Sequence, residues 1–196
     1  CEPVLTHNIK AIERDCRPMI RGLQLAMDLV HADKGVIAIK AIHGDAVRAL
    51  QQVIAADDRL ALHFLPNVYP VGEERAVVRE VLGTLLDAGS LPSKAGAVII
   101  NVETLQRVAE AVDDKKPLID KDVTVAGKLN GPEVQVFHDL PLGMAVNDVL
   151  EKAGGLGKEY GELIMGGPFM GRRTSLDAPI VKTTGGIIAA ETFLPG

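Results

Sequence analysis

Segments with helical and extended patterns alternate between residues 16 and 112, and this alternation is the strongest constraint on the fold. Apolar residues recur at helical spacing in some segments, and short β-branched runs lie between them. In chain order, we expect a helix at 17–31, a strand at 36–42, a helix at 44–55, a strand at 59–65, a helix at 72–86, a strand at 96–101 and a helix at 102–112. Strands that alternate with helices form a mostly parallel sheet with helices packed on it, so the predicted fold class is α/β. Ligands of such sheets bind beyond the carboxyl ends of the strands.

The composition excludes several classes of function. The chain of 196 residues has a net charge of −5, 3% aromatic residues and no Trp, whereas a nucleic-acid-binding surface needs a basic stripe and stacking side chains. No apolar run approaches the roughly 20 residues of a membrane-spanning helix, so no direct membrane insertion is expected. The cysteines, Cys1 and Cys16, suit a reducing cytosol and lack metal-ligand spacing, and the scattered histidines predict no metal site. Because the first residue is not Met and no signal peptide is visible, we expect a cytoplasmic fragment of a longer protein.

A change in character around residues 113–122 predicts a second module. This stretch, "DDKKPLIDKD", is highly charged, and two alternating runs follow it on either side of the hairpin signal Asn130-Gly131. A helix with a glycine-pair ending and further strands complete the pattern of a small α+β module of the β-grasp type. We expect three parts: an α/β domain over 1–116, the β-grasp module over 117–165, and a C-terminal segment over 166–196 that packs back on the first domain.

The segment Asn67–Glu74 follows the second predicted strand and leads into a helix, where a ligand of the sheet is expected. Free N–H groups at a helix N-terminus attract phosphate, but Glu73 and Glu74 occupy this first turn. The simplest interpretation is that both acids offset the helix dipole, each contributing roughly 0.3–1 kcal/mol. The alternative is that a carboxylate accepts hydrogen bonds from ligand hydroxyls such as those of a ribose. Since the same carboxylate would repel phosphate, such a turn would hold the sugar or ring part of a nucleotide.

A second polar turn follows the third predicted strand, with Asn101, Glu103 and Thr104 at the start of the next helix. Asn101 can cap that helix, or it can contact the polar edge of a ligand. Because both turns follow strands of one parallel sheet, we expect them to lie on the same rim.

Other candidate motifs favour structural interpretations. The segment "GGPFMGRR", residues 166–173, resembles a phosphate-binding loop, but Arg172 replaces the invariant lysine and no Ser or Thr follows directly. The segment "GGLGK" follows a helix, whereas a phosphate loop precedes one, so both are interpreted as turns. Cys16 lies at a predicted helix N-terminus, where a thiol pKa tends to fall, but it is interpreted as structural. His63, inside a strand, is interpreted as a packed core residue.

Ordered motifs give the chain a resemblance to a known family. They are "CEPVLTHN" at 1–8, "YPVGEERAVVREVLG" at 69–83, "NVETLQRVAEAV" at 101–112, "VTVAGKL" at 123–129 and "GGPFMG" at 166–171. Over essentially its whole length, the chain resembles the RnfC subunit of the Rnf electron-transport complex and the flavin subunit of respiratory complex I. The wording "HNIKAIERD" and "KTTGGII" makes it look closest to the RnfC-like proteins associated with proline reductase, the PrdC-like type.

The resemblance implies an NADH-linked electron-transfer flavoprotein that passes electrons through FMN and iron–sulfur centres to a reductase partner of the proline-reductase type. It implies no catalytic or metal-binding residue in this chain, and it implies cofactor-binding roles for Glu2, Tyr69, Gly72, Glu73, Glu74, Asn101 and Thr104. It also implies that residues from about 122 to 165 form a soluble-ligand-binding β-grasp (SLBB) module. FMN and NADH are expected in the full-length protein, because the family's glycine-rich flavin loop lies upstream of this chain.

The resemblance further implies that the 4Fe-4S clusters lie outside this fragment, so the fragment alone is expected to be inactive. Two alternatives remain open for the function. One is the RnfC subunit of a membrane-associated Rnf complex, and the other is a ligand-binding or docking module without a redox role. For both redox functions, the proline-reductase type and the Rnf type, the expected partners are a reductase or other electron-transfer subunits.

Overall fold

Helices and strands of the computed structural model, which describes residues 2–191, group into two units. The first unit comprises Ala11–Pro117, and the second comprises Glu2–Lys10 together with the chain from Leu118 onward. Helix α1 (His7–Arg14) begins in the second unit and ends in the first. The chain therefore passes from one unit to the other after Lys10 and again after Pro117.

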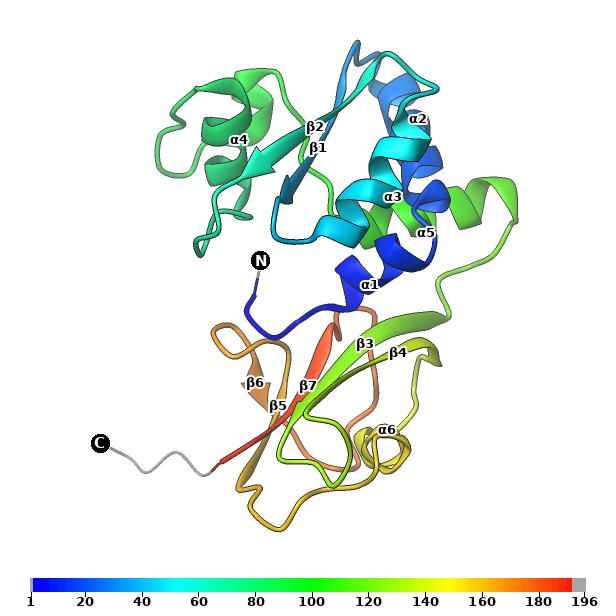
Figure 1. Ribbon diagram of the computed structural model, residues 1–196, viewed down its shortest axis with the longest axis vertical. Coiled ribbons are helices and arrows are strands. Elements are labelled where there is room, and N and C mark those ends of the chain that lie inside the picture. Colours follow the sequence, from blue (N-terminus) through cyan, green and yellow to red (C-terminus); the bar gives the residue numbers. More distant parts are fainter. Residues whose placement is uncertain (1, 192–196) are drawn as a thin grey trace. The chain divides into compact units, whose positions relative to one another are not determined.

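The parallel strands β1 (Gly35–Lys40) and β2 (Leu60–Leu65) form the sheet of the first unit (Figure 1). Their residues pair in order along the whole length of both strands. The remaining elements of this unit are α2 (Arg17–Val30), α3 (Gly44–Ile54), α4 (Glu74–Leu82), the 3-10 turn η1 (Pro92–Ala95) and α5 (Val102–Asp113). The helices and the first two strands expected from the sequence are thus confirmed, as is their mixed α/β character.

The third predicted strand, at 96–101, is wrong, because residues 97–100 take no regular secondary structure. Val98 is 61% exposed and Ile100 is 36% exposed. A β-branched run favours a strand only where it fits a pleated, half-buried surface beside a hydrogen-bonded neighbour, and the sheet contains only β1 and β2 among the described residues. The expected rim is therefore formed by β1 and β2 alone, and Asn101 follows an irregular segment.

Helix α4 is shorter than the pattern at 72–86 predicts. Gly83 takes a left-handed conformation with φ of 68°, and its N–H donates to the carbonyl oxygen of Arg79 at 2.9 Å. This is the usual way in which glycine ends a helix. Leu85, beyond this end, is 80% exposed.

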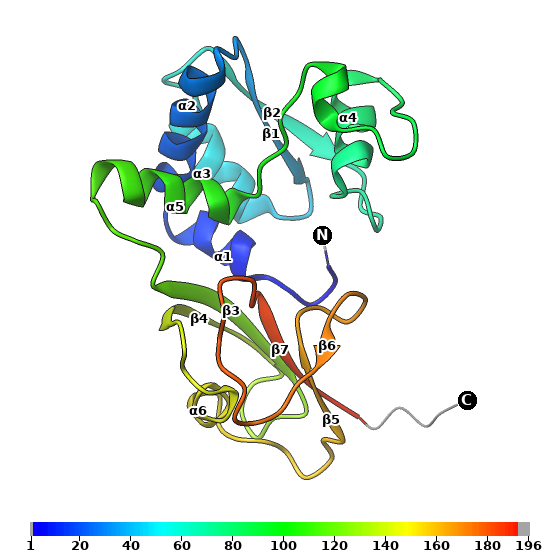
Figure 2. The same ribbon diagram turned by 180° about the vertical axis from the view of Figure 1, so that it is seen from behind.

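Helices α2 and α5 lie against each other in both views (Figures 1 and 2). Met19 and Ile20 of α2 are buried, as are Leu105 and Ala109 of α5. The backbones meet at Gly22, where an added Cβ atom would lie 1.8 Å from the carbonyl oxygen of Leu105. Only glycine fits this contact.

A mixed sheet of five strands builds the second unit, in the order β4-β3-β7-β5-β6 within the described residues (Figure 1). The strands are β3 (Asp120–Gly127), β4 (Val134–Pro141), β5 (Glu162–Met165), β6 (Arg172–Arg173) and β7 (Gly186–Ala190). The pairs β3–β4, β5–β6 and β5–β7 are antiparallel, whereas β7 runs parallel to β3. The hairpin predicted around Asn130-Gly131 is confirmed, since β3 and β4 flank it.

Helix α6 (Val146–Lys152) supplies much of the core of the second unit. Val146, Val149 and Leu150 are almost fully buried and belong to one cluster with the side chains of the sheet. The cluster includes Val123 and Val125 of β3. Because successive side chains of a strand point to opposite faces, Thr124 between them points away from this core.

The hydroxyl of Thr124 joins β3 to the start of α1 inside the second unit. The backbone N–H groups of Thr6 and His7 each donate to Thr124 Oγ1 at 3.0 Å, and His7 Nδ1 lies 3.2 Å from the same atom. Two accepted N–H bonds use both lone pairs of the hydroxyl, so its own hydrogen is donated to Nδ1. His7 is therefore neutral, with its proton on Nε2.

The C-terminal segment from residue 166 was expected to pack on the first domain. In the structure, its strands β6 and β7 are hydrogen-bonded into the sheet of the second unit. Residues 192–196 of this segment, like Cys1, lie outside the described residues.

Candidate functional site

Glu73 caps the N-terminus of α4. Its carboxylate accepts hydrogen bonds from the backbone N–H groups of Arg75 and Ala76, both at 3.1 Å, and from Arg75 Nε at 3.3 Å. Slight burial raises the pKa of Glu73, but the backbone N–H donors and the Arg75 guanidinium outweigh it and hold that pKa below its usual range. Because these N–H groups already hold an anion, the helix N-terminus offers no seat for a phosphate.

Glu74, the next residue and the first residue of α4, is exposed. Within the described part of the chain, its carboxylate takes part in no hydrogen bond or ion pair. Adjacent acids of one turn thus have different roles: one binds its own helix, and the other is available to a ligand.

The turn before this helix is compact. The peptide bond between Tyr69 and Pro70 is cis, the N–H of Glu73 donates to the carbonyl oxygen of Pro70 at 2.8 Å, and Val71 is only 2% exposed. Tyr69 is 43% exposed, and Gly72 is exposed beside the two acids. The buried Val71 anchors the turn that presents Glu74.

Asn101 caps α5, as one of the two sequence interpretations allows. Its Oδ1 accepts from the N–H of Glu103 at 2.9 Å. Its side-chain NH₂ group makes no hydrogen bond to any described residue, and Thr104 lies exposed three residues further on. The cap therefore leaves an amide donor and a hydroxyl open to a ligand.

Glu2 belongs to the second unit, whereas the other predicted site residues belong to the first. Its carboxylate accepts from the backbone N–H groups of Phe169, at 3.2 Å, and Met170, at 2.8 Å. The structure thus groups Tyr69, Gly72, Glu73 and Glu74 on one turn and Asn101 with Thr104 on another. The partnership of Glu2 with the loop 166–171 was missed from the sequence, although the glycine pattern of that loop could have signalled a close backbone contact.

Cys16 is 3% exposed and its Sγ lies 3.5 Å from the carbonyl oxygen of Ala49. Burial raises the pKa of this thiol and outweighs the lowering that a helix N-terminus favours, and the structural interpretation of Cys16 agrees with its burial. His63 is half-buried in β2.

We expect Cys16 to react with iodoacetamide on the order of a hundredfold more slowly in the folded protein than after unfolding in guanidinium. In the folded protein the thiol is buried and its raised pKa disfavours the reactive thiolate. Mass spectrometry of the peptide that contains Cys16 measures both rates. Equal rates would contradict the buried position of the thiol.

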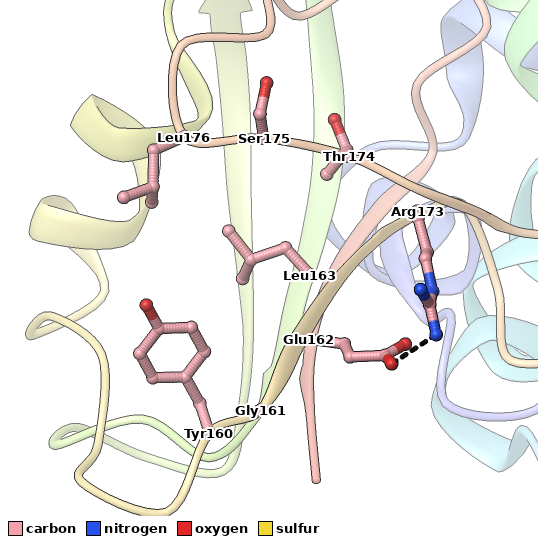
Figure 3. A pocket seen from close by; sticks show the side chains of 8 residues that line it. All are labelled: Tyr160, Gly161, Glu162, Leu163, Arg173, Thr174, Ser175 and Leu176. Carbon is pink, nitrogen blue, oxygen red and sulfur yellow. Dashed lines mark hydrogen bonds and ion pairs between the residues drawn. The ribbon is translucent and has the colours of Figure 1, made fainter. Parts of the chain in front are cut away.

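A pocket of about 300 Å³ lies in the second unit beside β5 and the segment that follows β6 (Figure 3). Tyr160, Leu163 and Leu176 contribute apolar surface, and an ion pair between Glu162 and Arg173 lies at its edge. None of the predicted site residues lines it.

Neither a metal-binding cluster nor a membrane-spanning helix is present among residues 2–191. No group of three or more His, Cys, Asp or Glu in this range is placed to hold a metal ion. None of the helices in the same range combines the length and the apolar character needed to cross a bilayer.

Comparisons with known proteins give the context for these turns. The model of the family described as the Nuo51 FMN-binding domain matches residues 1–110. Cobalamin reductase PduS of Salmonella typhimurium is 36% identical over 196 residues, which is 100% of this chain and 42% of that protein. One component of the Na⁺-translocating ferredoxin:NAD⁺ oxidoreductase complex of Acetobacterium woodii is 33% identical over 190 residues, which is 96% of this chain and 42% of that protein. One component of the ion-translocating oxidoreductase complex of Yersinia enterocolitica is 30% identical over 190 residues, 96% of this chain and 27% of that protein.

The chain spans less than half the length of these curated relatives. The resemblance to RnfC proteins and to the flavin subunit of complex I is confirmed, whereas a particular likeness to the PrdC-like type stays a prediction. The family match covers the turns at Glu73 and Asn101 and more than half of the 196 residues. This chain belongs to the Nuo51 FMN-binding domain family.

Proposed function

We propose that this chain is the flavin- and nicotinamide-binding core of an electron-transfer flavoprotein that takes electrons from NADH. The family match over residues 1–110 supports FMN as the cofactor. The names of relatives that are subunits of oxidoreductase complexes support an electron-transfer role with protein partners. NADH as the donor and 4Fe-4S centres in the rest of the full-length protein complete the proposal.

The observation that carries the proposal is the division of roles between Glu73 and Glu74. Because the carboxylate of Glu73 already accepts the N–H groups of Arg75 and Ala76, a phosphate group at the start of α4 would meet negative charge and two occupied donors. Glu74 keeps an exposed carboxylate, which is a strong acceptor for the paired hydroxyls of a ribose. The turn thus suits the nucleoside part of a dinucleotide.

The second turn suits the flavin. The open NH₂ group of Asn101 and the hydroxyl of Thr104 match the carbonyl and nitrogen acceptors of a flavin ring, so the residues fit this cofactor. Gly72 permits close approach to the backbone, and Tyr69 offers an exposed ring beside it. Glu2 is proposed as a further cofactor-binding residue, because the acidic residue of the Glu-Pro motif has this role in the family that the chain resembles. When bound, FMN supplies the conversion between two-electron and one-electron transfer, and the protein supplies position and electrostatics.

The second unit is proposed to be a β-grasp module of the soluble-ligand-binding type. When the strands β3 to β7 are numbered 1 to 5, their order in the sheet is 2-1-5-3-4. Helix α6 lies between β4 and β5 in the sequence, which are the second and third strands of the unit. This arrangement supports assigning residues 117–165, completed by β6 and β7, to that module.

The test of the nicotinamide site is Glu74→Gln in the full-length protein. A hydrogen bond to a charged acceptor contributes about 1.5–3 kcal/mol, so the Kd for NADH is expected to rise roughly tenfold to a hundredfold. Fluorescence titration with NADH measures the affinity, and the flavin content is measured in the same preparation.

Glu133→Gln is the matched control, because it removes the same charge from an exposed position in the second unit. It should leave the Kd for NADH unchanged. Glu73→Gln should speed hydrogen exchange in the first turn of α4, since it weakens the cap. An unchanged Kd in Glu74→Gln would remove Glu74 from the site.

The proposed electron acceptor is a protein partner of the proline-reductase type. Full-length protein supplied with NADH should reduce that partner faster than it reduces ferredoxin or cobalamin. Faster reduction of ferredoxin would favour an Rnf-type complex, and faster reduction of cobalamin would favour the chemistry in the name of the PduS relatives.

The second candidate function is a ligand-binding or docking module without a redox role, and the pocket beside Tyr160 favours it (Figure 3). The colour of the full-length protein separates the candidates. A yellow preparation that reduces a dye with NADH supports the flavoprotein, and a colourless preparation without this activity supports the docking module.

A further inference from the structure

The loop 166–171, between β5 and β6, is held in one conformation by close contacts. An added Cβ at Gly171 would lie 2.4 Å from both the carbonyl oxygen of Gly167 and Cγ2 of Ile164. Gly166 has φ of 110°, and its N–H donates to the carbonyl oxygen of Gly186 at 2.8 Å. The glycines of "GGPFMG" are therefore required by the backbone path, and Pro168 restricts it further.

Glu2 fixes the tip of this loop. Its carboxylate accepts the N–H groups of Phe169 and Met170, and an added Cβ at Gly167 would lie 2.5 Å from Glu2 Cδ. Charge-assisted hydrogen bonds of this kind are stronger than neutral ones. The N-terminal segment thus holds the loop from the far end of the sequence.

The side chains at this fixed tip point into solvent. Phe169 is 62% exposed and Met170 is 77% exposed. Exposing two large apolar side chains to water is unfavourable in free energy, so burying them against a partner is favourable. Because their backbone is already fixed, less conformational entropy is lost when a partner binds. Phe and Met are enriched in the centres of protein–protein interfaces.

An exposed cation, Arg172, follows the tip in the chain. Arg172 is exposed and forms no ion pair with any described residue, whereas the guanidinium of Arg173 is held by Glu162 (Figure 3). The carboxylate of Glu2 is bound by the backbone N–H groups of Phe169 and Met170, so Arg172 supplies an exposed charge beside the apolar pair. An acidic group on a partner would complement it.

We infer that the Phe169–Met170 tip with Arg172 is a docking element for a protein partner that presents an apolar depression rimmed by Asp or Glu. Glu2 is the positioning residue that holds this element. The inference rests on contacts within the second unit, in which Glu2 has a role besides the cofactor-binding role proposed above.

The test places the photo-crosslinking residue p-benzoylphenylalanine at position 169 of the full-length protein in its own cells, with position 134, where Val134 is 44% exposed, as the control in the same unit. Irradiation should give one adduct from position 169, and mass spectrometry should map it to a partner peptide that contains apolar residues and Asp or Glu. The control should give less than about a tenth of this adduct. No adduct, or an adduct that maps to this chain, to a basic peptide or to lipid, would overturn the inference.

Two further variants test the charge and the apolar tip. Arg172→Glu should reduce the adduct from position 169 roughly tenfold, whereas Lys158→Glu, a charge reversal at another exposed site of the unit, should leave it unchanged. The double variant Phe169→Ala with Met170→Ala should no longer form the native complex, so its native mass should be that of the protein alone. NADH-dependent dye reduction should be retained in this variant. A complex of unchanged mass in that variant would contradict a docking role.

Discussion

Gly22→Ala is expected to destabilise the first unit by roughly 1–3 kcal/mol or more. The added Cβ would lie 1.8 Å from the carbonyl oxygen of Leu105, and a backbone atom cannot rotate away as the end of a side chain can. Helices α2 and α5 must therefore separate, which opens the packing around Met19 and Ile20. The better helix propensity of alanine offsets only about 1 kcal/mol. Hydrogen exchange of the α2 and α5 peptides in the full-length protein measures the loss.

The matched control is Gly44→Ala at the start of α3. There an added Cβ meets only the end of the flexible Arg48 side chain, at 3.5 Å. Gly44→Ala should leave exchange unchanged or slow it slightly. Equal exchange in the Gly22 and Gly44 variants would mean that α2 and α5 do not pack as closely as described.

Acidification is expected to destabilise the second unit through His7. Burial, followed by the nearby positive charge of Lys121, lowers the pKa of His7 to about 4 from an ordinary value of 6.5, against the smaller opposing effect of Asp122. The unfolded chain therefore binds the proton first. The contribution of neutral His7 is fully present above pH 6.5 and is lost as the pH falls from about 6.5 to about 4, with a total on the order of 3 kcal/mol.

The measurement is hydrogen exchange in the peptides of β3 and the start of α1, corrected for the intrinsic pH dependence of exchange. His7→Gln should flatten the dependence between pH 6.5 and 4, because the titrating group is gone. His31→Gln, at an exposed position, should retain the wild-type dependence. A His7 variant with the full wild-type dependence would assign the effect to other groups.

Most helices, and the turns that cap them, could be predicted from local signals in the sequence. The apolar spacing of α2 and α5 is contained in each segment, and the acids at 73 and 74 mark the start of α4 within a few residues. The sequence indicated an interaction with the helix dipole at this turn, but it could not show which acid caps the helix. That depends on the extended backbone of Glu73, with ψ of 141°, which lets its carboxylate reach the N–H groups of Arg75 and Ala76.

Features that depend on distant residues could not be predicted. Residues 97–100 have the composition of a strand, but a strand also needs a neighbour to pair with, and local composition does not reveal one. The place of Cys16 at a helix end favours a lowered thiol pKa, whereas the raised pKa follows from its burial, which the sequence does not reveal. The contact of Glu2 with Met170 joins residues 168 positions apart.

The sheet of the second unit cannot be completed until β7 has been synthesised. β7 is the last strand of the described chain, yet it lies between β3 and β5 and supplies the hydrogen bonds that join the two hairpins. On the ribosome, both hairpins emerge with an open edge before Gly186–Ala190 follows. Open edges recruit other chains, so a product that stops short of Gly186 is a target for chaperones and proteases.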